Sequence, residues 1–139
     1  MKLDTGSREA AKEYAHKGWA VLPLLPNKKD PHFDLVQRAY LSATTDQTLI
    51  NFWFDYDENI NIGIACYQSG IVVFDGLHLY YTADKSDVFK GKLIDGIDIK
   101  WKGYVATAPS IHPSGATYKV IDDRDPVAMP KVIREWATK

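Results

Sequence analysis

The chain has 139 residues, of which 45% are hydrophobic and 25% charged, and its formal net charge is −1. These values are typical of one folded domain and exclude a globally basic nucleic-acid binder, so a phosphate-binding surface has to be a local patch. A single cysteine, Cys66, excludes an internal disulfide, and no stretch reaches the roughly 18–20 apolar residues of a membrane span. We expect one cytoplasmic domain over residues 1–139, with no membrane partner.

The first predicted elements are a helix and a strand. The helix follows Ser7, which serves as its N-cap, and Gly18 ends it. Its inward face is small and apolar except for one tyrosine. Residues 19–24 form a strand, and Pro23 favours a position near a sheet edge because proline cannot donate to a ladder. The composition of residues 26–31 predicts a loop.

A second helix starts at Thr45 or Asp46, and its inward residues are Leu49, Ile50 and Trp53. Two apolar strands follow, over residues 60–66 and 71–75. The short segment between them predicts a hairpin. The small side chain of Cys66 favours a place in the core rather than a role as a nucleophile.

Further strands are predicted over residues 78–82, 97–101, 104–106 and 116–121. Pro130 suits the first turn of a closing helix that runs toward Trp136. Helices at both ends with many strands between them indicate an α+β fold with a mostly antiparallel sheet.

Two acids accompany apolar strands. Asp75 follows the apolar run 71–74, and Asp98 lies between two isoleucines. Because side chains alternate along a strand, Asp98 lies on the opposite face from those isoleucines. Either acid alone is more often a turn or cap residue than a ligand. The two acids together with His78, each on a strand, favour a site built on a sheet.

An ordered series of short motifs extends from about residue 9 to about residue 136. The motifs are Pro23-Leu24-Leu25-Pro26-Asn27-Lys28-Lys29-Asp30-Pro31, Ala43-Thr44-Thr45-Asp46 with Trp53, Asn61-Ile62-Gly63-Ile64-Ala65, Ser69-Gly70-Ile71-Val72-Val73-Phe74-Asp75, His78-Leu79-Tyr80-Tyr81, Gly96-Ile97-Asp98, Gly103-Tyr104-Val105-Ala106, Ala108-Pro109-Ser110-Ile111-His112, Ser114-Gly115 and Tyr118. Each motif is short, but their order and spacing are specific. The series resembles the bifunctional DNA primase–polymerase domain of phage, plasmid and prophage replication proteins, in the archaeo-eukaryotic primase superfamily.

The resemblance implies a fold, a reaction and partners. The fold is the archaeo-eukaryotic primase-type catalytic core, which is α+β with an RRM-like, mostly antiparallel sheet and flanking helices. The reaction is template-directed nucleotidyl transfer from NTP or dNTP on single-stranded DNA, with two Mg²⁺ or Mn²⁺ ions. A helicase module in the parent protein or genome is the further partner implied.

The resemblance also implies roles for individual residues. Asp75 and Asp98 match catalytic metal ligands, and His78 matches a catalytic histidine that contacts the nucleotide's phosphates. Hard cations such as Mg²⁺ and Mn²⁺ prefer the carboxylate oxygens that the two acids offer. Lys100 shares the face of Asp98 and either contacts phosphate or is solvated.

Ser110 and His112 lie where the family has a Pro-Ser-x-His stretch, and they either contact the nucleotide or form a structural turn. Lys28, Lys29 and Arg38 are candidates for a local basic patch that contacts template DNA or triphosphate. Solvated surface charges are the alternative for these three residues.

The connection after Asp75 departs from the family pattern. The family has a second acid two positions later, where this chain has Leu77, and it has tens of residues before the histidine strand. Here only Gly76 and Leu77 separate Asp75 from His78. A natural loss, an engineered deletion or a segment absent from the sequence explains this, and a two-residue type II′ turn allows continuity. We expect the chain to bind nucleotide and metal but to extend primers poorly or not at all.

Two alternatives remain open. The first is a non-catalytic module of the same fold that binds nucleotide or single-stranded DNA, with Tyr80, Tyr81 and Tyr104 as stacking candidates. The second is a metal-dependent nuclease built on Asp75 and Asp98. Primer extension separates the polymerase from both alternatives, and a nuclease assay separates the second.

Overall fold

The computed structural model describes residues 6–76, 79–118 and 125–138. In these ranges four α-helices, one 3₁₀ helix and eight strands form a mixed α+β fold. In chain order they are α1 (Ser7–His16), β1 (Val21–Leu24), η1 (Ala39–Ser42), α2 (Gln47–Tyr56), β2 (Asn61–Ala65), α3 (Cys66–Ser69), β3 (Ile71–Asp75), β4 (Leu79–Thr82), β5 (Lys92–Ile94), β6 (Ile97–Lys100), β7 (Tyr104–Ala106), β8 (Val127–Ala128) and α4 (Lys131–Thr138).

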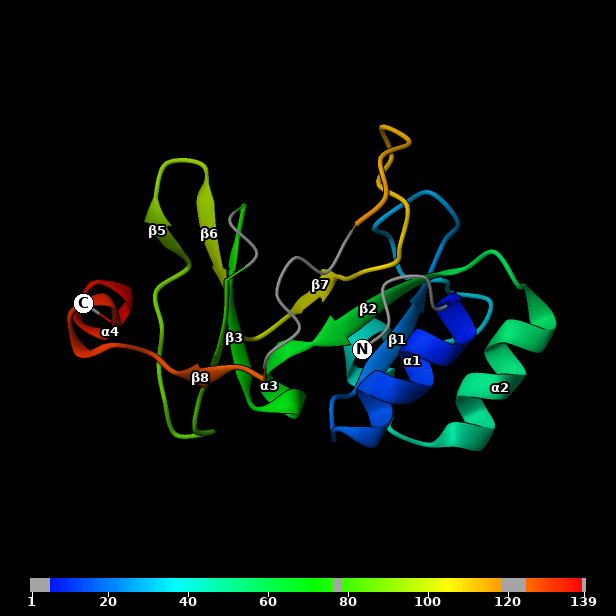
Figure 1. The fold of residues 1–139 in the computed structure, drawn as a ribbon, viewed down its shortest axis with the longest axis horizontal. Helices are drawn as coiled ribbons and strands as arrows, with labels where there is room; N and C mark the ends of the chain where they lie inside the picture. Colours follow the sequence, from blue (N-terminus) through cyan, green and yellow to red (C-terminus); the bar gives the residue numbers. More distant parts are fainter. Residues whose placement is uncertain (1–5, 77–78, 119–124, 139) are drawn as a thin grey trace.

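The strands form two sheets. A three-stranded antiparallel sheet has the order β1-β2-β7, and a five-stranded sheet has the order β5-β6-β3-β4-β8, in which only β4 and β8 are parallel. Figure 1 shows the three-stranded sheet with α1 and α2 on one side of the molecule and the five-stranded sheet with α4 on the other. The α+β class and the mostly antiparallel pairing are confirmed. The RRM-like arrangement is not confirmed.

The predicted hairpin between the strands at 60–66 and 71–75 is wrong. Residues 66–69 instead form the helical turn α3, and Gly70 follows it with a φ of 69°, in the left-handed region that favours glycine. The turn sends β2 into the three-stranded sheet and β3 into the five-stranded sheet. The Ser69 hydroxyl, which accepts a hydrogen bond from the Ala20 N–H at 2.8 Å, ties this turn to the chain just before β1.

The helices follow the predicted pattern with two corrections. Helix α1 begins at Ser7 itself, with Gly6 as N-cap, so Ser7 does not cap it. In α2 the Asp46 carboxylate accepts from the Thr48 N–H at 2.9 Å, as an N-cap does. Leu49 is 38% exposed rather than inward, and Phe54 occupies the core in its place.

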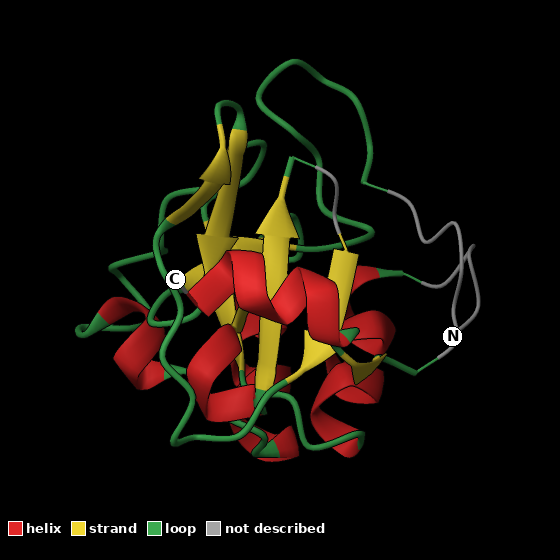
Figure 2. Cartoon of the chain, turned by 90° about the vertical axis from the view of Figure 1, so that its left-hand side faces the viewer, coloured by secondary structure: helices red, strands yellow, loops and turns green. Residues whose placement is uncertain are grey.

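Strand β3 divides the hydrophobic core in two. Ile71 and Val73 pack with α1, α2 and β2, whereas Val72 and Phe74 pack on the opposite face with β6 and α4. Because side chains alternate, Asp75 extends from the face that carries Ile71 and Val73. Figure 2 shows α4 lying across the other face of this sheet.

The end of the chain was predicted less well. A strand over 116–121 is not present in its described part, where Thr117 only bridges Ile111, and residues 119–121 lie outside the described ranges. Helix α4 follows Pro130, whose carbonyl accepts from the Arg134 N–H, so the predicted closing helix is confirmed.

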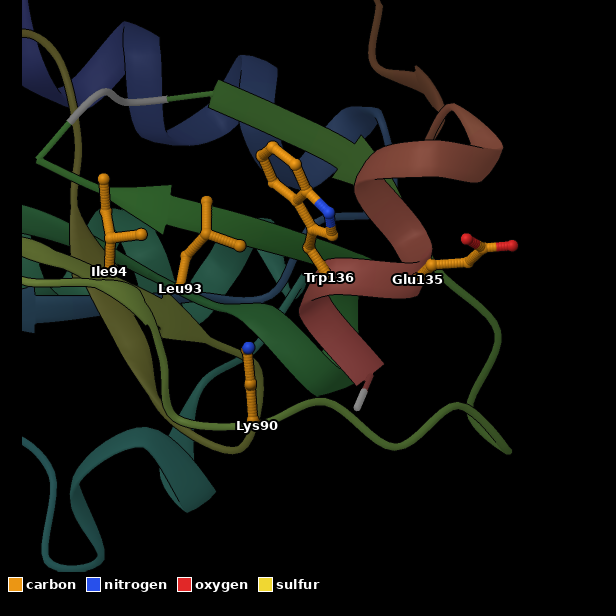
Figure 3. A pocket seen from close by; sticks show the side chains of 5 residues that line it. All are labelled: Lys90, Leu93, Ile94, Glu135 and Trp136. Carbon is orange, nitrogen blue, oxygen red and sulfur yellow. The ribbon is translucent and has the colours of Figure 1, made fainter.

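Between α4 and β5 lies a pocket of about 400 Å³, shown in Figure 3. None of the helices in the described ranges has the length and hydropathy needed to cross a membrane.

Candidate functional site

The antiparallel pairing of β3 and β6 places Asp75 directly opposite Asp98. Directly opposed residues on antiparallel strands have Cα atoms roughly 4.5–5.5 Å apart and project side chains from the same face. We call these two residues the acid pair. The structure therefore brings together two acids that lie 23 positions apart in the sequence.

The backbone beside Asp75 requires glycine. The Asp75 carboxylate accepts a hydrogen bond from the Gly76 N–H at 3.1 Å. Gly76 has a φ of +100°, and a Cβ at this position would lie 2.7 Å from the carbonyl oxygen of Gly96, in the turn before β6. Asp75 is half-buried and Asp98 is exposed, so the acid pair lies at the accessible end of the two strands.

Lys100 lies on the same face as the acid pair, opposite Val73 in the β3–β6 ladder. Its charge reaches Cys66, a fully buried core residue as predicted. Burial raises the pKa of the Cys66 thiol to about 12, with a smaller lowering effect from Lys100 and a smaller raising effect from Asp75. Lys100 and Asp75 lie on the same face, in neighbouring rows of the β3–β6 ladder.

A tyrosine network borders this face. Tyr80 on β4 lies opposite Val73 on β3. Burial raises the pKa of Tyr80, and a hydrogen bond with Thr107 offsets part of that rise. Thr107 also donates to the Tyr14 hydroxyl at 3.1 Å, and Tyr14 donates to the Ala108 carbonyl at 2.8 Å. Tyr80 packs against Trp19 at a ring-centroid distance of 6.1 Å. These contacts give Tyr80 a packing role and link the strands to the segment that follows β7.

That segment carries Ser110 and is held by buried polar contacts. The Ser110 side chain is 1% exposed, and its hydroxyl both accepts from the Ile62 N–H at 2.7 Å and donates to the Ile62 carbonyl at 3.1 Å. Asn61 donates to the carbonyls of Lys28 and Ile111 and accepts from the Ile111 N–H, at 2.7–3.0 Å. These bonds make the structural role of Ser110 evident, and a contact between Ser110 and nucleotide stays a prediction.

His112 lies in the turn beyond Ser110, half-buried, with its ring next to Tyr118 at 5.9 Å. The Ser114 N–H donates to His112 Nδ1 at 3.0 Å. A backbone N–H can only donate, so Nδ1 carries the lone pair and the neutral ring has its proton on Nε2. The contact with Ser114 therefore leaves the Nε2–H donor of the neutral ring unused by Ser114.

The basic residues proposed for DNA or phosphate contacts lie on loops. Lys28 and Lys29 are exposed, and their carbonyls accept from the Asn61 amide and from the Tyr104 hydroxyl. Arg38 is exposed just before η1, and within the described ranges no hydrogen bond or ion pair joins it to either lysine. A shared basic patch formed by these three residues stays a prediction. In Figure 1 the loop after β1, the segment after β7 and the Asp75 end of β3 lie at the same upper side.

His78 and Leu77 lie outside the described residues. In the described part of the chain, no three residues among the His, Cys, Asp and Glu side chains come together as a metal-binding group. The acid pair supplies two carboxylate groups, whose oxygens are the donors that Mg²⁺ and Mn²⁺ prefer. This donor set fits one hard divalent cation, with further ligands coming from water or substrate.

The fold and the site define an α+β domain with a carboxylate pair on opposed antiparallel strands. A family model described as "Bifunctional DNA primase/polymerase, N-terminal" matches residues 11–76 and 74–132. The chain belongs to this family, as its sequence motifs predicted. Searches of the curated proteins and of the solved structures each found no match.

The family match is divided at a meaningful point. Its two segments overlap at residues 74–76, directly before Leu77, where the sequence motifs also predicted a departure from the family pattern. Family membership indicates DNA synthesis of the primase/polymerase type, with nucleotide and DNA as substrates, and such enzymes typically depend on metal ions.

The sequence did not predict that Asn61 fixes the neighbouring loops. A polar residue at the start of a buried strand was the feature that could have indicated this role.

Proposed function

We propose that this chain is the nucleotide-binding and nucleotidyl-transfer domain of a DNA replication protein. The substrates are a nucleoside triphosphate and a primer or initiating nucleotide on single-stranded DNA. The observation that carries the proposal is the register of β3 and β6, which opposes Asp75 and Asp98 in a chain of the primase/polymerase family. A helicase module elsewhere in the parent protein or genome belongs to the same proposal.

Each site residue has a distinct part in this proposal. Asp75 and Asp98 would hold the divalent cation that polarises the attacking 3′-hydroxyl, and a second cation, bound mainly by the triphosphate, would neutralise the charge of the phosphates. Lys100, on the same face, contacts a phosphate through its ammonium group. His112 donates from Nε2 to an anionic oxygen, and His78 contacts the phosphates as the family resemblance implies.

The basic residues Lys28, Lys29 and Arg38 act on the template backbone as exposed charges. Each phosphate contact of this kind adds salt-dependent affinity without sequence preference. Ser110 supports the site by fixing the segment that carries His112, through its two hydrogen bonds to Ile62.

The missing second acid limits the reaction. Two closely spaced divalent cations require more negative charge than the acid pair offers. The triphosphate brings its own oxygens, so nucleotide binding is less dependent on the missing ligand than the chemical step. We therefore expect the 139-residue chain to bind nucleotide but to extend primers poorly.

Primer extension with labelled nucleotides tests this proposal. A longer form that contains the family's second acid should extend a primer, and Asp98→Ala in that form should abolish synthesis. Robust extension by the 139-residue chain, abolished by Asp75→Ala, would show that the second acid is unnecessary and that the account of the site is wrong.

A non-catalytic binding module is the second candidate, and Leu77 in place of an acid favours it. This module would bind nucleoside triphosphate or single-stranded DNA through the same face. Failure of the longer form to extend any primer, together with retained nucleotide binding, would favour this candidate over the polymerase.

A further inference from the structure

Lys92 is a third charged residue in line with the acid pair. In the five-stranded sheet, β5 pairs with β6 so that Lys92 lies directly opposite Asp98, and Asp98 in turn lies opposite Asp75. The three residues thus form one row across three neighbouring strands. Opposed residues project from the same face, so Lys92 shares the face of the acid pair.

An irregularity in β5 permits this placement. The β5–β6 register shifts between Lys92 and Ile94, so an extra residue is accommodated on β5. Leu93 and Ile94 both line the pocket beside Trp136, and Figure 3 shows them projecting on the α4 side. With two successive side chains on that side, the bulge leaves Lys92 on the opposite face, with Asp98.

The charges on this face are arranged around Asp98. Neighbouring strands lie about 4.8 Å apart, and Lys100 lies two residues, or about 7 Å, along β6 from Asp98. Lys92 is exposed and Lys100 half-buried. Across the described ranges neither lysine forms an ion pair, although each lies within a few ångströms of a carboxylate-bearing strand. Two lysines therefore flank Asp98 on the face of the acid pair, one on the neighbouring strand and one further along β6, and in the described ranges neither has an ion-pair partner.

We propose that Lys92 binds the outer phosphates of the nucleoside triphosphate, opposite Lys100. This inference rests on the proposed function of the acid pair and adds a residue to that site. An anion held above Asp98 lies within reach of both lysines, because a lysine side chain extends about 6 Å from its backbone. A nucleoside monophosphate lacks the outer phosphates and carries less negative charge than the triphosphate, so Lys92 matters most for the triphosphate.

Calorimetric titration of the 139-residue chain with dATP and with dAMP, in the presence of Mg²⁺, tests the inference. Lys92→Met should weaken dATP binding about tenfold, the size of one charge-assisted contact, and should weaken dAMP binding much less. Lys92→Arg, which keeps the charge, should restore most of the affinity for dATP. Lys90→Met is the matched control, because Lys90 lines the pocket on the α4 side of the sheet, and it should leave dATP binding unchanged.

The results that would contradict the proposed function differ from those that would contradict the role of Lys92. Absence of dATP binding by the wild-type chain would overturn the proposed function and this inference with it. Normal wild-type binding that Lys92→Met leaves unchanged, or weakens equally for dATP and dAMP, would overturn only the role of Lys92. Urea unfolding midpoints equal to that of the wild type establish that the variants are folded.

Discussion

The two sheets use their polar residues in opposite ways. In the three-stranded sheet, Asn61 is 3% exposed and makes three hydrogen bonds to neighbouring loops. Ser110, on the segment that follows β7, has both of its hydrogen bonds to the backbone of Ile62 in the same sheet. In the five-stranded sheet, Asp75 and Asp98 oppose each other at an accessible strand end, and Asp75 accepts one hydrogen bond from its neighbour Gly76.

This contrast distinguishes polar residues that stabilise the fold from polar residues that are open to a ligand. A buried amide or hydroxyl stabilises the fold only when its partners are protein atoms, because unmade hydrogen bonds in the interior are costly. Two adjacent carboxylates repel each other and gain stability when a cation joins them. Asn61 and Ser110 therefore belong to the framework, whereas ligand binding by the acid pair is our proposal.

Asn61→Ala should have the largest effect on stability. The substitution removes three hydrogen bonds and leaves the backbone groups of Lys28 and Ile111 without their partner. We expect a loss of about 2–4 kcal/mol in the free energy of unfolding, measured by urea denaturation. Asn59→Ala, at an exposed position, is the control. Equal stability of the two variants would remove Asn61 from the framework.

Gly76→Ala should cost somewhat less stability but should also disturb the acid pair. The new Cβ meets the Gly96 carbonyl and the backbone has a positive φ, so we expect a loss of about 1–3 kcal/mol. Gly91→Ala, where a Cβ meets no atom within 4 Å, is the control. Thermal and urea unfolding measure the difference. A Gly76→Ala variant as stable as Gly91→Ala would contradict the described path of the chain beside Asp75.

Ser110→Ala should destabilise the protein by about 1–2 kcal/mol, because the Ile62 N–H and carbonyl lose a buried partner. Thr45→Ala, at an exposed position, should be nearly neutral. Measured under conditions where both variants are folded, dATP affinity should be little changed. A large loss of affinity with unchanged stability would instead assign the Ser110 hydroxyl to the nucleotide.

Alkaline stability should reflect Cys66 and give the smallest effect. Its folded pKa is about 12 and its unfolded value 9.0, so the folded state keeps a proton that the unfolded state loses. This contribution is fully present below pH 9 and is lost as the pH rises from 9 toward 12, by about 1 kcal/mol at pH 10. Urea titrations at several pH values should therefore show a shallower decline for Cys66→Ala. Identical slopes would show that burial does not suppress thiol ionisation.

Local patterns predicted much of the secondary structure. The Asp46 cap, the apolar strand ending at Asp75 and the alternation around Asp98 all follow from short-range rules, and the structure has each of them. The family motifs added the expectation that the two acids meet. Their opposition then follows from a single register between β3 and β6.

Features that depend on long-range pairing were not predicted. The segment 66–70 has hairpin composition, yet Gly70 and the pairing of β2 with β7 direct the chain into a second sheet. The three-residue strand β5 is too short to show a pattern, and its bulge is visible only through its pairing with β6. Lys92 was missed for that reason, because only the register places it beside Asp98.

Binding of Mn²⁺ to the 139-residue chain, followed by the electron paramagnetic resonance signal of unbound Mn²⁺, measures whether the acid pair is a cation site. We expect Asp75→Asn and Asp98→Asn each to weaken binding at least about tenfold, since each removes one of two carboxylate ligands. Asp95→Asn, an exposed acid in the turn before β6, should bind like the wild type. Wild-type affinity in both Asp75→Asn and Asp98→Asn would contradict the assignment of the acid pair as a cation site.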